Sequence, residues 1–160
     1  MYDRILVPTD GSEAALAAAR EAIELATDGG AELLVVYVID ESASNLFVST
    51  KSMNDAIGEM RDRGADAVAD VEAMAADAGV PVTTDVVRGM HIDEAIVDYA
   101  TANDADLVVM GTFGRRGVEH LLGSTTERVL AKTTIPVLSV AVPKSVASED
   151  AAGEEQSADE

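Results

Sequence analysis

The sequence predicts an α/β protein with a single doubly wound, five-stranded parallel sheet and helices on both faces. Five short runs rich in β-branched residues alternate with segments of helical periodicity, and this alternation favours a parallel sheet. Two of the runs are almost continuously apolar, which is typical of strands that are covered on both faces. A chain of 160 residues with 48% apolar residues suits one domain with one core.

The expected strands follow one another at regular intervals. They are residues 4–8, 32–39, 82–87, 107–110 and 137–142, and the second and fourth are the apolar ones. Between them, apolar residues recur every three or four positions over 16–26, 57–78 and 92–100, which predicts three helices. Gly29-Gly30 and Gly79-Val80-Pro81 are stop signals after the first two.

Two segments lack any periodicity. Residues 41–52 are rich in serine and are expected to form a loop. Residues 144–160 contain six carboxylates and one lysine, with almost nothing to bury, which predicts a disordered acidic tail. We therefore expect a folded domain at 1–143 and a tail at 144–160.

Composition limits the partners and the compartment. The formal charge is −19, from 30 acidic and 11 basic residues, so neither nucleic acid nor an anionic membrane is an expected partner. With no cysteine, no signal peptide and no run of ~18 apolar residues, we expect a cytoplasmic protein. The acidic surface suits either simple solubility or a halophilic, salt-rich cytoplasm, where ions screen self-repulsion.

A glycine-rich loop follows the fourth strand, at the edge of the sheet where doubly wound proteins bind ligands. Gly111, Gly114 and Gly117 precede Gly123-Ser124, and the capping-box spacing of Ser124 and Glu127 predicts that a helix begins there. Glycines and a helix N-terminus suit a phosphate. Residues 111–132 also carry a net charge of +2, because they contain four basic residues, Arg115, Arg116, Arg128 and Lys132, and only two acidic ones, Glu119 and Glu127. From the pattern alone, a tight turn and a simple helix cap remain equally open.

The motifs resemble those of the universal stress protein family over residues 2–142. The opening Ile5-Leu6-Val7-Pro8-Thr9-Asp10-Gly11-Ser12 and the closing Ile135-Pro136-Val137-Leu138-Ser139-Val140 look like the two ends of that family. Met110-Gly111-Thr112-Phe113-Gly114 followed by Leu121-Leu122-Gly123-Ser124 resembles the signature of its ATP-binding branch. The resemblance implies the adenine nucleotide alpha hydrolase-like fold with strand order 3-2-1-4-5.

The resemblance also implies a binding site. Pro8 and Thr9 line the base pocket, Asp10 faces the ribose or adenine, Val38 offers its backbone to adenine, and Met110 belongs to the same signature. The phosphates are surrounded by the first part of the loop, Gly111, Gly114, Arg115, Arg116 and Gly117. The phosphate site is completed by the start of the next helix, Gly123, Ser124, Thr125 and Thr126. The ligand implied is ATP or another adenine nucleotide, with Mg²⁺. A homodimer joined through residues 137–142 and a role as a stress-response sensor are implied as well.

Two alternatives remain open. Only eight residues separate Gly114 from Gly123, where the family pattern has nine, so a dimeric interaction protein that binds no nucleotide is one. A slow ATPase is the other, although no pair of residues is clearly placed to activate a nucleophile. Asp10 itself could simply cap the first helix, because Glu13 follows at capping-box spacing.

The remaining polar residues are expected to have ordinary structural roles. His91 and His120 are too isolated to form a metal cluster, so surface or capping roles are expected and no metal ligand is assigned. Asp93, Glu94 and Asp98 fall at the start and on the polar side of the third helix. We expect all three carboxylates to be solvated.

Overall fold

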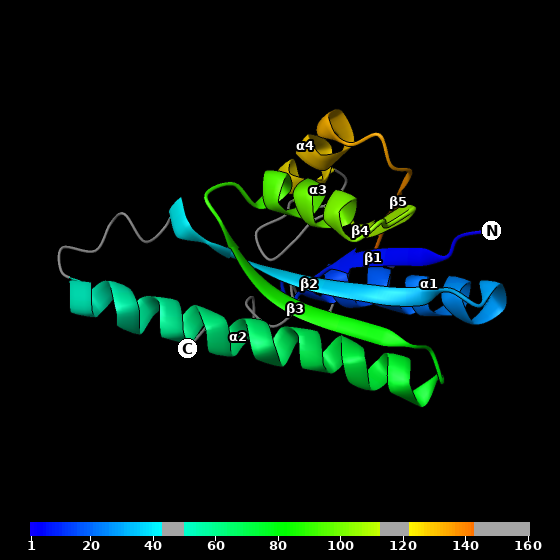
Figure 1. Ribbon diagram of the computed structural model, residues 1–160, viewed down its shortest axis with the longest axis horizontal. Helices are drawn as coiled ribbons and strands as arrows, with labels where there is room; N and C mark the ends of the chain where they lie inside the picture. The colour runs from blue at the N-terminus through cyan, green and yellow to red at the C-terminus, as the bar shows by residue number, and fades with distance from the viewer. Residues whose placement is uncertain (43–49, 113–121, 143–160) are drawn as a thin grey trace, which may run out of the picture.

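One parallel sheet lies between two layers of helices (Figure 1). The computed structural model describes residues 1–42, 50–112 and 122–142. Within them, five strands are ordered β3-β2-β1-β4-β5 and every neighbouring pair is parallel. The elements are β1 (Arg4–Pro8), α1 (Glu13–Gly29), β2 (Glu32–Asp40), α2 (Thr50–Asp77), β3 (Val82–Gly89), α3 (Ile92–Ala102), β4 (Leu107–Gly111), α4 (Ser124–Lys132) and β5 (Val137–Val140). The predicted fold class and strand order are confirmed.

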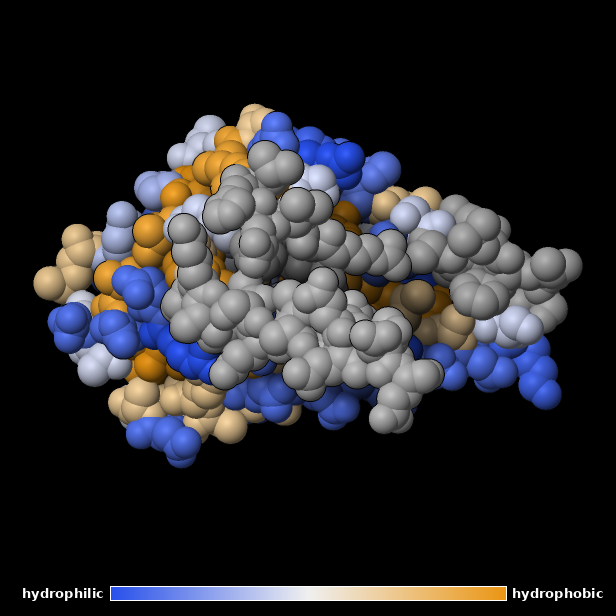
Figure 2. Space-filling view, turned by 180° about the vertical axis from the view of Figure 1, so that it is seen from behind, coloured by the Kyte–Doolittle hydropathy of each residue, from blue (hydrophilic) through white to orange (hydrophobic). Residues whose placement is uncertain are grey.

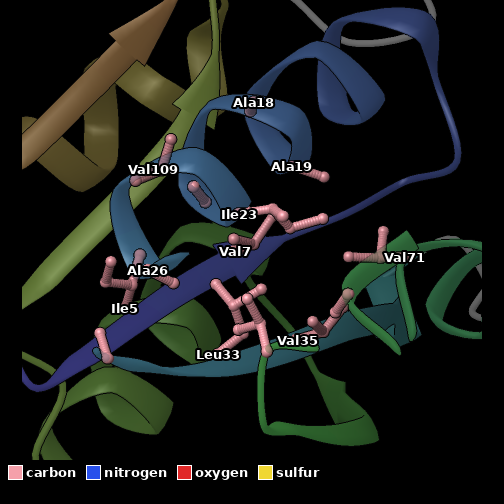
Figure 3. Close-up of a cluster of buried hydrophobic side chains, with 14 of the residues drawn as sticks. Ile5, Val7, Ala18, Ala19, Ile23, Ala26, Leu33, Val35, Val71 and Val109 are labelled. Carbon is pink, nitrogen blue, oxygen red and sulfur yellow. The ribbon is translucent and has the colours of Figure 1, made fainter. Parts of the chain in front are cut away.

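The face of α1 that meets the sheet is made mostly of alanine. Its buried residues are Ala14, Ala15, Ala18, Ala19, Ala22, Ile23 and Ala26. In Figure 3, side chains of α1 such as Ile23 and Ala26 gather over Ile5 and Val7 of β1. Short side chains allow the helix to lie close to the strands, so α1 braces β1 and β4 from one side.

Helix α2 completes this layer over β2 and β3. Val68 and Val71 on its C-terminal half join the core, whereas its N-terminal end extends past the sheet (Figure 1). In the view from behind, hydrophilic side chains gather at the lower right, over that projecting end (Figure 2). None of the helices in the described ranges is long and apolar enough to cross a membrane.

Helices α3 and α4 cover the opposite face. Ile96 of α3 and Val129 of α4 pack over Leu6, Val36 and Val108 in a second buried cluster. Because both faces of the sheet are covered, the central strands are apolar in consecutive positions, as the sequence pattern of β2 and β4 indicates.

The predicted bounds hold best inside the strands and worst at the ends of elements. β1 matches its predicted range, but β5 ends at Val140, two residues early, since its last register partner is Gly111 at the end of β4. α2 begins at Thr50, inside the range expected to be a loop. The acidic tail, 144–160, lies outside the described residues.

The strand order creates a switch point between β1 and β4. Their pairing includes only Ile5 with Leu107 and Leu6 with Val108, and β1 continues to pair with β2 as far as Pro8. From β1 the chain connects toward β2, whereas β4 lies on the other side of β1. In doubly wound sheets, ligands bind beyond the carboxyl ends of the strands at this point.

Candidate functional site

Two polar residues follow β1 at the switch point. Thr9 is buried; its amide donates to the carbonyl of Val36 at 2.9 Å, and its hydroxyl accepts from the amide of Gly11 at 3.2 Å. Asp10 is exposed, and its Oδ1 accepts from the amide of Ser12 at 2.9 Å. The other carboxylate oxygen of Asp10 has no partner among the described residues, so it is available to a ligand.

Ser12, rather than Asp10, caps α1. Its Oγ accepts from the amide of Ala15 at 3.2 Å. The alternative reading of Asp10 as the helix cap is therefore wrong, because the helix starts two residues later than that spacing implies. Asp10 instead shapes the turn that leads into the cap.

β2 continues past the end of β1 and leaves backbone groups unpaired. Pairing with β1 ends at Val36, whose carbonyl accepts the last bond from that side. Peptide groups alternate in direction along a strand, so those of Val38 point to the same side as those of Val36. No backbone bond from the described residues reaches Val38 on that side, which faces the space beyond β1. The family resemblance implies that the backbone of Val38 binds adenine, and this side of β2 is where such a contact would be made.

Gly111, at the end of β4, is required by packing. A Cβ at this position would lie 2.7 Å from the backbone carbonyl of Ala14 and 2.8 Å from its Cβ. No side chain fits between the end of β4 and the start of α1. Independently of any ligand, Gly111 therefore allows β4 and α1 to pack closely at the site.

Thr112 is a residue that sequence reasoning missed. Its Oγ1 is buried and has no hydrogen-bond partner in the described part of the chain. Buried hydroxyls are nearly always paired, so an unpaired one beside a candidate site is a fitting ligand contact. Its position inside the Gly111 to Gly114 motif is the signal that could have found it.

The first turn of α4 has no side-chain cap. The N-cap is Gly123, not Ser124, so the predicted capping box is wrong. Glycine has no side-chain oxygen that could accept from the amides of the first turn, and the amides of Ser124 and Thr125 have no partner among the described residues. Free amides at a helix N-terminus, together with the helix dipole, attract an anion.

Two hydrogen bonds fix this turn to the end of β4. The amide of Gly123 donates to the carbonyl of Thr112, and the hydroxyl of Thr126 donates to the carbonyl of Gly111 at 2.9 Å. Thr126 is 3% exposed, so its side chain braces the helix against the strand. The sequence-predicted residues of β4 and α4 are thus brought together.

The other sequence-predicted residues divide into two groups. Pro8 is half-buried at the end of β1, and Met110 is buried in the core cluster on the α3 and α4 side. Gly114, Arg115, Arg116 and Gly117 lie outside the described residues, as does His120. His91 occupies the N-cap of α3 but makes no side-chain capping bond.

Lys132 and Asp93 differ from the sequence reading. The Nζ of Lys132 lies 2.6 Å from Oδ2 of Asp93 and 3.0 Å from Oε1 of Glu94, so Lys132 belongs to an ion pair and not to a phosphate-facing cluster. The side chain of Asp93 is 5% exposed, so the prediction that it is solvated is wrong. Glu94 and Asp98 are exposed, as predicted. The periodicity of α3 could not show that the end of α4 covers its first turn.

The charge of Asp93 is set by two opposing effects. Burial favours the neutral carboxyl, but the ammonium of Lys132, the backbone amide of Asp93 itself and the charge of Arg128 outweigh it and hold the pKa of Asp93 below its usual value. The contact is an ion pair rather than a well-aligned hydrogen bond, because Oδ2 has no partner with hydrogen-bond geometry among the described residues. Asp93 is thus a buried, charged residue at neutral pH.

Two hollows lie near the carboxyl edge of the sheet. The smaller borders Asp10 on the side of α2 and is lined by Gly11, Tyr37, Arg63, Asp66, Ala67 and Asp70. Three carboxylates around a single arginine make it unsuited to an anion. The larger is a groove between β3 and α3, lined among others by Arg88, Met90 and Asp98, on a different part of the edge.

Among the described residues, no three His, Cys, Asp or Glu side chains are grouped to hold a metal ion. Mg²⁺ commonly keeps several waters and takes its other ligands from substrate phosphates. Such an ion would need few ligands from the protein, and the exposed carboxylate of Asp10 lies at this edge of the sheet.

Fold and site together define the class: a doubly wound α/β protein with an uncapped helix and polar groups at its switch point. The model of the universal stress protein family matches residues 1–141. The universal stress protein MJ0531 of Methanocaldococcus jannaschii is 40% identical over 148 residues, which cover 90% of this chain and 85% of that protein. The chain belongs to the universal stress protein family.

Solved structures agree with this assignment. The structure of MJ0577, also from Methanocaldococcus jannaschii, matches with a TM-score of 0.80 at 29% identity and covers 89% of this chain and 98% of that one. A universal stress protein in complex with cAMP matches with a TM-score of 0.58 at 26% identity, covering 88% and 97% of the two chains.

Proposed function

We propose that this protein binds an adenine nucleotide, with ATP as the first candidate, at the carboxyl edge between β1 and β4. The observation that carries the proposal is the first turn of α4, which lacks a side-chain cap and lies beside the buried hydroxyl of Thr112; within the described ranges that hydroxyl has no partner. Both features leave hydrogen-bonding capacity that a phosphorylated ligand would satisfy.

The nucleoside half of the ligand would lie over β1 and β2. The unpaired backbone of Val38 offers a donor and an acceptor side by side, which suits the edge of a purine base. The free carboxylate oxygen of Asp10 would accept from a ribose hydroxyl. Neither interaction depends on the position of α4.

The phosphate half would lie over β4 and α4. The amides of Ser124 and Thr125 would donate to phosphate oxygens, and Thr112 would supply one further hydroxyl. Gly114, Arg115, Arg116 and Gly117 belong to the same proposal through the sequence signature. Mg²⁺ would be held mainly by the phosphates and water.

The family comparison supports the choice of adenine. A relative that is 26% identical and covers 88% of this chain was solved in complex with cAMP. That protein's ligand shares its adenine ring and a phosphate group with ATP. The backbone of Val38 and the amides of Ser124 and Thr125 support a site for both parts at this edge.

We further propose that the protein acts as a cytoplasmic, homodimeric sensor in a stress response, with nucleotide occupancy as its signal. β5 is a terminal strand of the sheet, so its outer edge can accept a second copy. Turnover is not part of the proposal, since no described side chains at the edge form a base–nucleophile pair.

Calorimetry with ATP and Mg²⁺ at high salt tests the proposal. Wild type is compared with Thr112→Val, which removes the unpaired hydroxyl at nearly constant volume, and with Thr83→Val, the same change on exposed β3. Thr112→Val should weaken binding by about tenfold, which corresponds to about 1.4 kcal/mol. Thr83→Val should bind like wild type. No binding by wild type at high protein concentration would refute the proposal and favour a dimeric interaction protein without a nucleotide.

A further inference from the structure

Helix α4 depends on its neighbours for its position. It has nine residues, too few for a stable isolated helix in water. It packs chiefly against α3, and Val129 is the one residue of α4 in the fully buried part of the core (Figure 1). Its orientation therefore depends on a small number of contacts.

Besides Val129 in the middle of the helix, polar contacts hold its two ends. At the start, the hydroxyl of Thr126 donates to the carbonyl of Gly111. At the end, Lys132 pairs with Asp93 at 2.6 Å and with Glu94 at 3.0 Å. The nine residues span about 13 Å, so contacts at both ends fix the direction of the helix axis.

The contact at the C-terminal end is costly to break because Asp93 is buried. Its carboxylate is almost inaccessible to water and lies in the first turn of α3, where the helix dipole favours it. Loss of Lys132 would leave this charge buried without its main partner, which is far more costly than loss of a surface pair. The buried carboxylate thus holds the last turn of α4 in place.

We propose that Asp93 and Lys132 are positioning residues for the phosphate half of the nucleotide site. The pair fixes the axis of α4, and this aims the amides of Ser124 and Thr125, which have no partner in the described part of the chain, beyond the end of β4. The inference rests on the proposed nucleotide binding. It adds a specific consequence: the pair sets affinity for phosphate groups and leaves affinity for the nucleoside unchanged, because Val38 and Asp10 lie on other elements.

The test compares ATP with adenosine on the same proteins. Lys132→Met breaks the pair, Lys132→Arg keeps the charge, and Lys51→Met removes an exposed lysine with the same change of net charge. Lys132→Met should weaken ATP binding at least tenfold and change adenosine binding less than twofold. Lys132→Arg should restore most of the ATP affinity, and Lys51→Met should match wild type for both ligands.

A second variant guards against loss of folding. In Asp93→Asn with Lys132→Met, no unpaired charge is buried, so this protein should fold and still show the selective loss of ATP affinity. Equal losses for ATP and adenosine, or no loss for either, would overturn the positioning role. If wild type bound neither ligand, the proposed function itself would fail, a result distinct from failure of the pair.

Discussion

Gly111 shows how one residue can serve the fold and the site at once. The backbone of Ala14 is so close that any Cβ must push α1 away from β4. Overpacking of this kind costs about 1–3 kcal/mol. We therefore expect Gly111→Ala to lower the free energy of unfolding by about that amount, measured by urea denaturation without nucleotide.

Gly58→Ala is the matched control for this prediction. Gly58 is exposed within α2, and a Cβ there has nothing within 4 Å. The same substitution should stabilise the protein by up to about 1 kcal/mol, since alanine is the better helix former. Equal effects at both positions would show that the close contact between Gly111 and Ala14 is not important.

Asp93 makes a prediction about acid stability. Its pKa is lower in the folded protein than its usual value of 3.8, so the pair stabilises the fold above that pH and ceases to do so as the pH falls through the lower, folded value. The charged groups near it are Lys132, Glu94 and Arg128. Asp93→Asn should cost about 1–3 kcal/mol at pH 7.

The difference between wild type and Asp93→Asn should shrink as the pH falls below the usual value of 3.8, because the unfolded chain then takes up a proton at Asp93 while the folded protein stays ionised, and it should level off only below the lower, folded pKa. Chemical denaturation of the two proteins at pH 7, 5 and 3 measures it. A difference that stays constant down to pH 3 would show that the carboxylate charge contributes nothing.

For single residues, the sequence predicts well which of them lie at the carboxyl edge of the sheet, but it predicts their individual structural roles less well. Asp10, Gly111 and Ser124 lie where the motifs place them. Three details were inaccessible: the close approach of Ala14 to Gly111, the unpaired hydroxyl of Thr112 and the burial of Asp93. Each depends on a residue distant in sequence, and local periodicity contains no information about such neighbours.

At the scale of elements, a single hydrogen bond joins α3 to the edge strand β3. The hydroxyl of Tyr99 donates to Oδ2 of Asp85 at 2.5 Å. Burial, followed by this bond and the charge of Asp85, raises the pKa of Tyr99 well above its usual value of 10. We expect Tyr99→Phe to destabilise the protein by about 1 kcal/mol at pH 8.

The contribution of Tyr99 should be lost as the pH rises above 10. There the unfolded chain ionises at this tyrosine while the folded protein still keeps the proton, so wild type loses stability that Tyr99→Phe does not. Urea denaturation of both proteins at pH 8 and pH 10.5 checks this. A gap that widens with rising pH would contradict it.

Elements were predictable where periodicity is strong and uncertain where they end. Short runs rich in β-branched residues located all five strands, and the stop signal at Gly29-Gly30 is confirmed by Gly30, which takes φ 72° at the C-cap of α1. α4 begins at Ser124, where the spacing of Ser124 and Glu127 predicts a helix start, but its N-cap is Gly123, so no capping box forms. The predicted capping box concealed the uncapped turn on which the proposed site depends.

At the scale of the whole molecule, charge dominates. The net charge of −19 makes carboxylates across the surface repel one another. Salt screens this repulsion between charges that are farther apart than the Debye length, which is about 8 Å at 0.15 M and about 3 Å at 1 M. We expect the melting temperature to rise on the order of 5–10 °C between 0.2 M and 2 M KCl. Thermal unfolding followed by circular dichroism measures it.

Choline chloride at equal ionic strength separates general screening from specific ion binding. Equal stabilisation by both salts would indicate screening, and a larger effect of KCl would indicate bound potassium. A melting temperature that does not change or falls as salt increases would contradict the prediction.

The central claim is that an adenine nucleotide binds at the switch point, and amide shifts in a ¹H–¹⁵N NMR titration with ATP and Mg²⁺ test it most directly. They report both binding and location. The account predicts shifts at Val38, Thr112, Ser124 and Thr125, with Thr83 unchanged. No shifts, or shifts confined to the groove at Arg88, Met90 and Asp98, would contradict it.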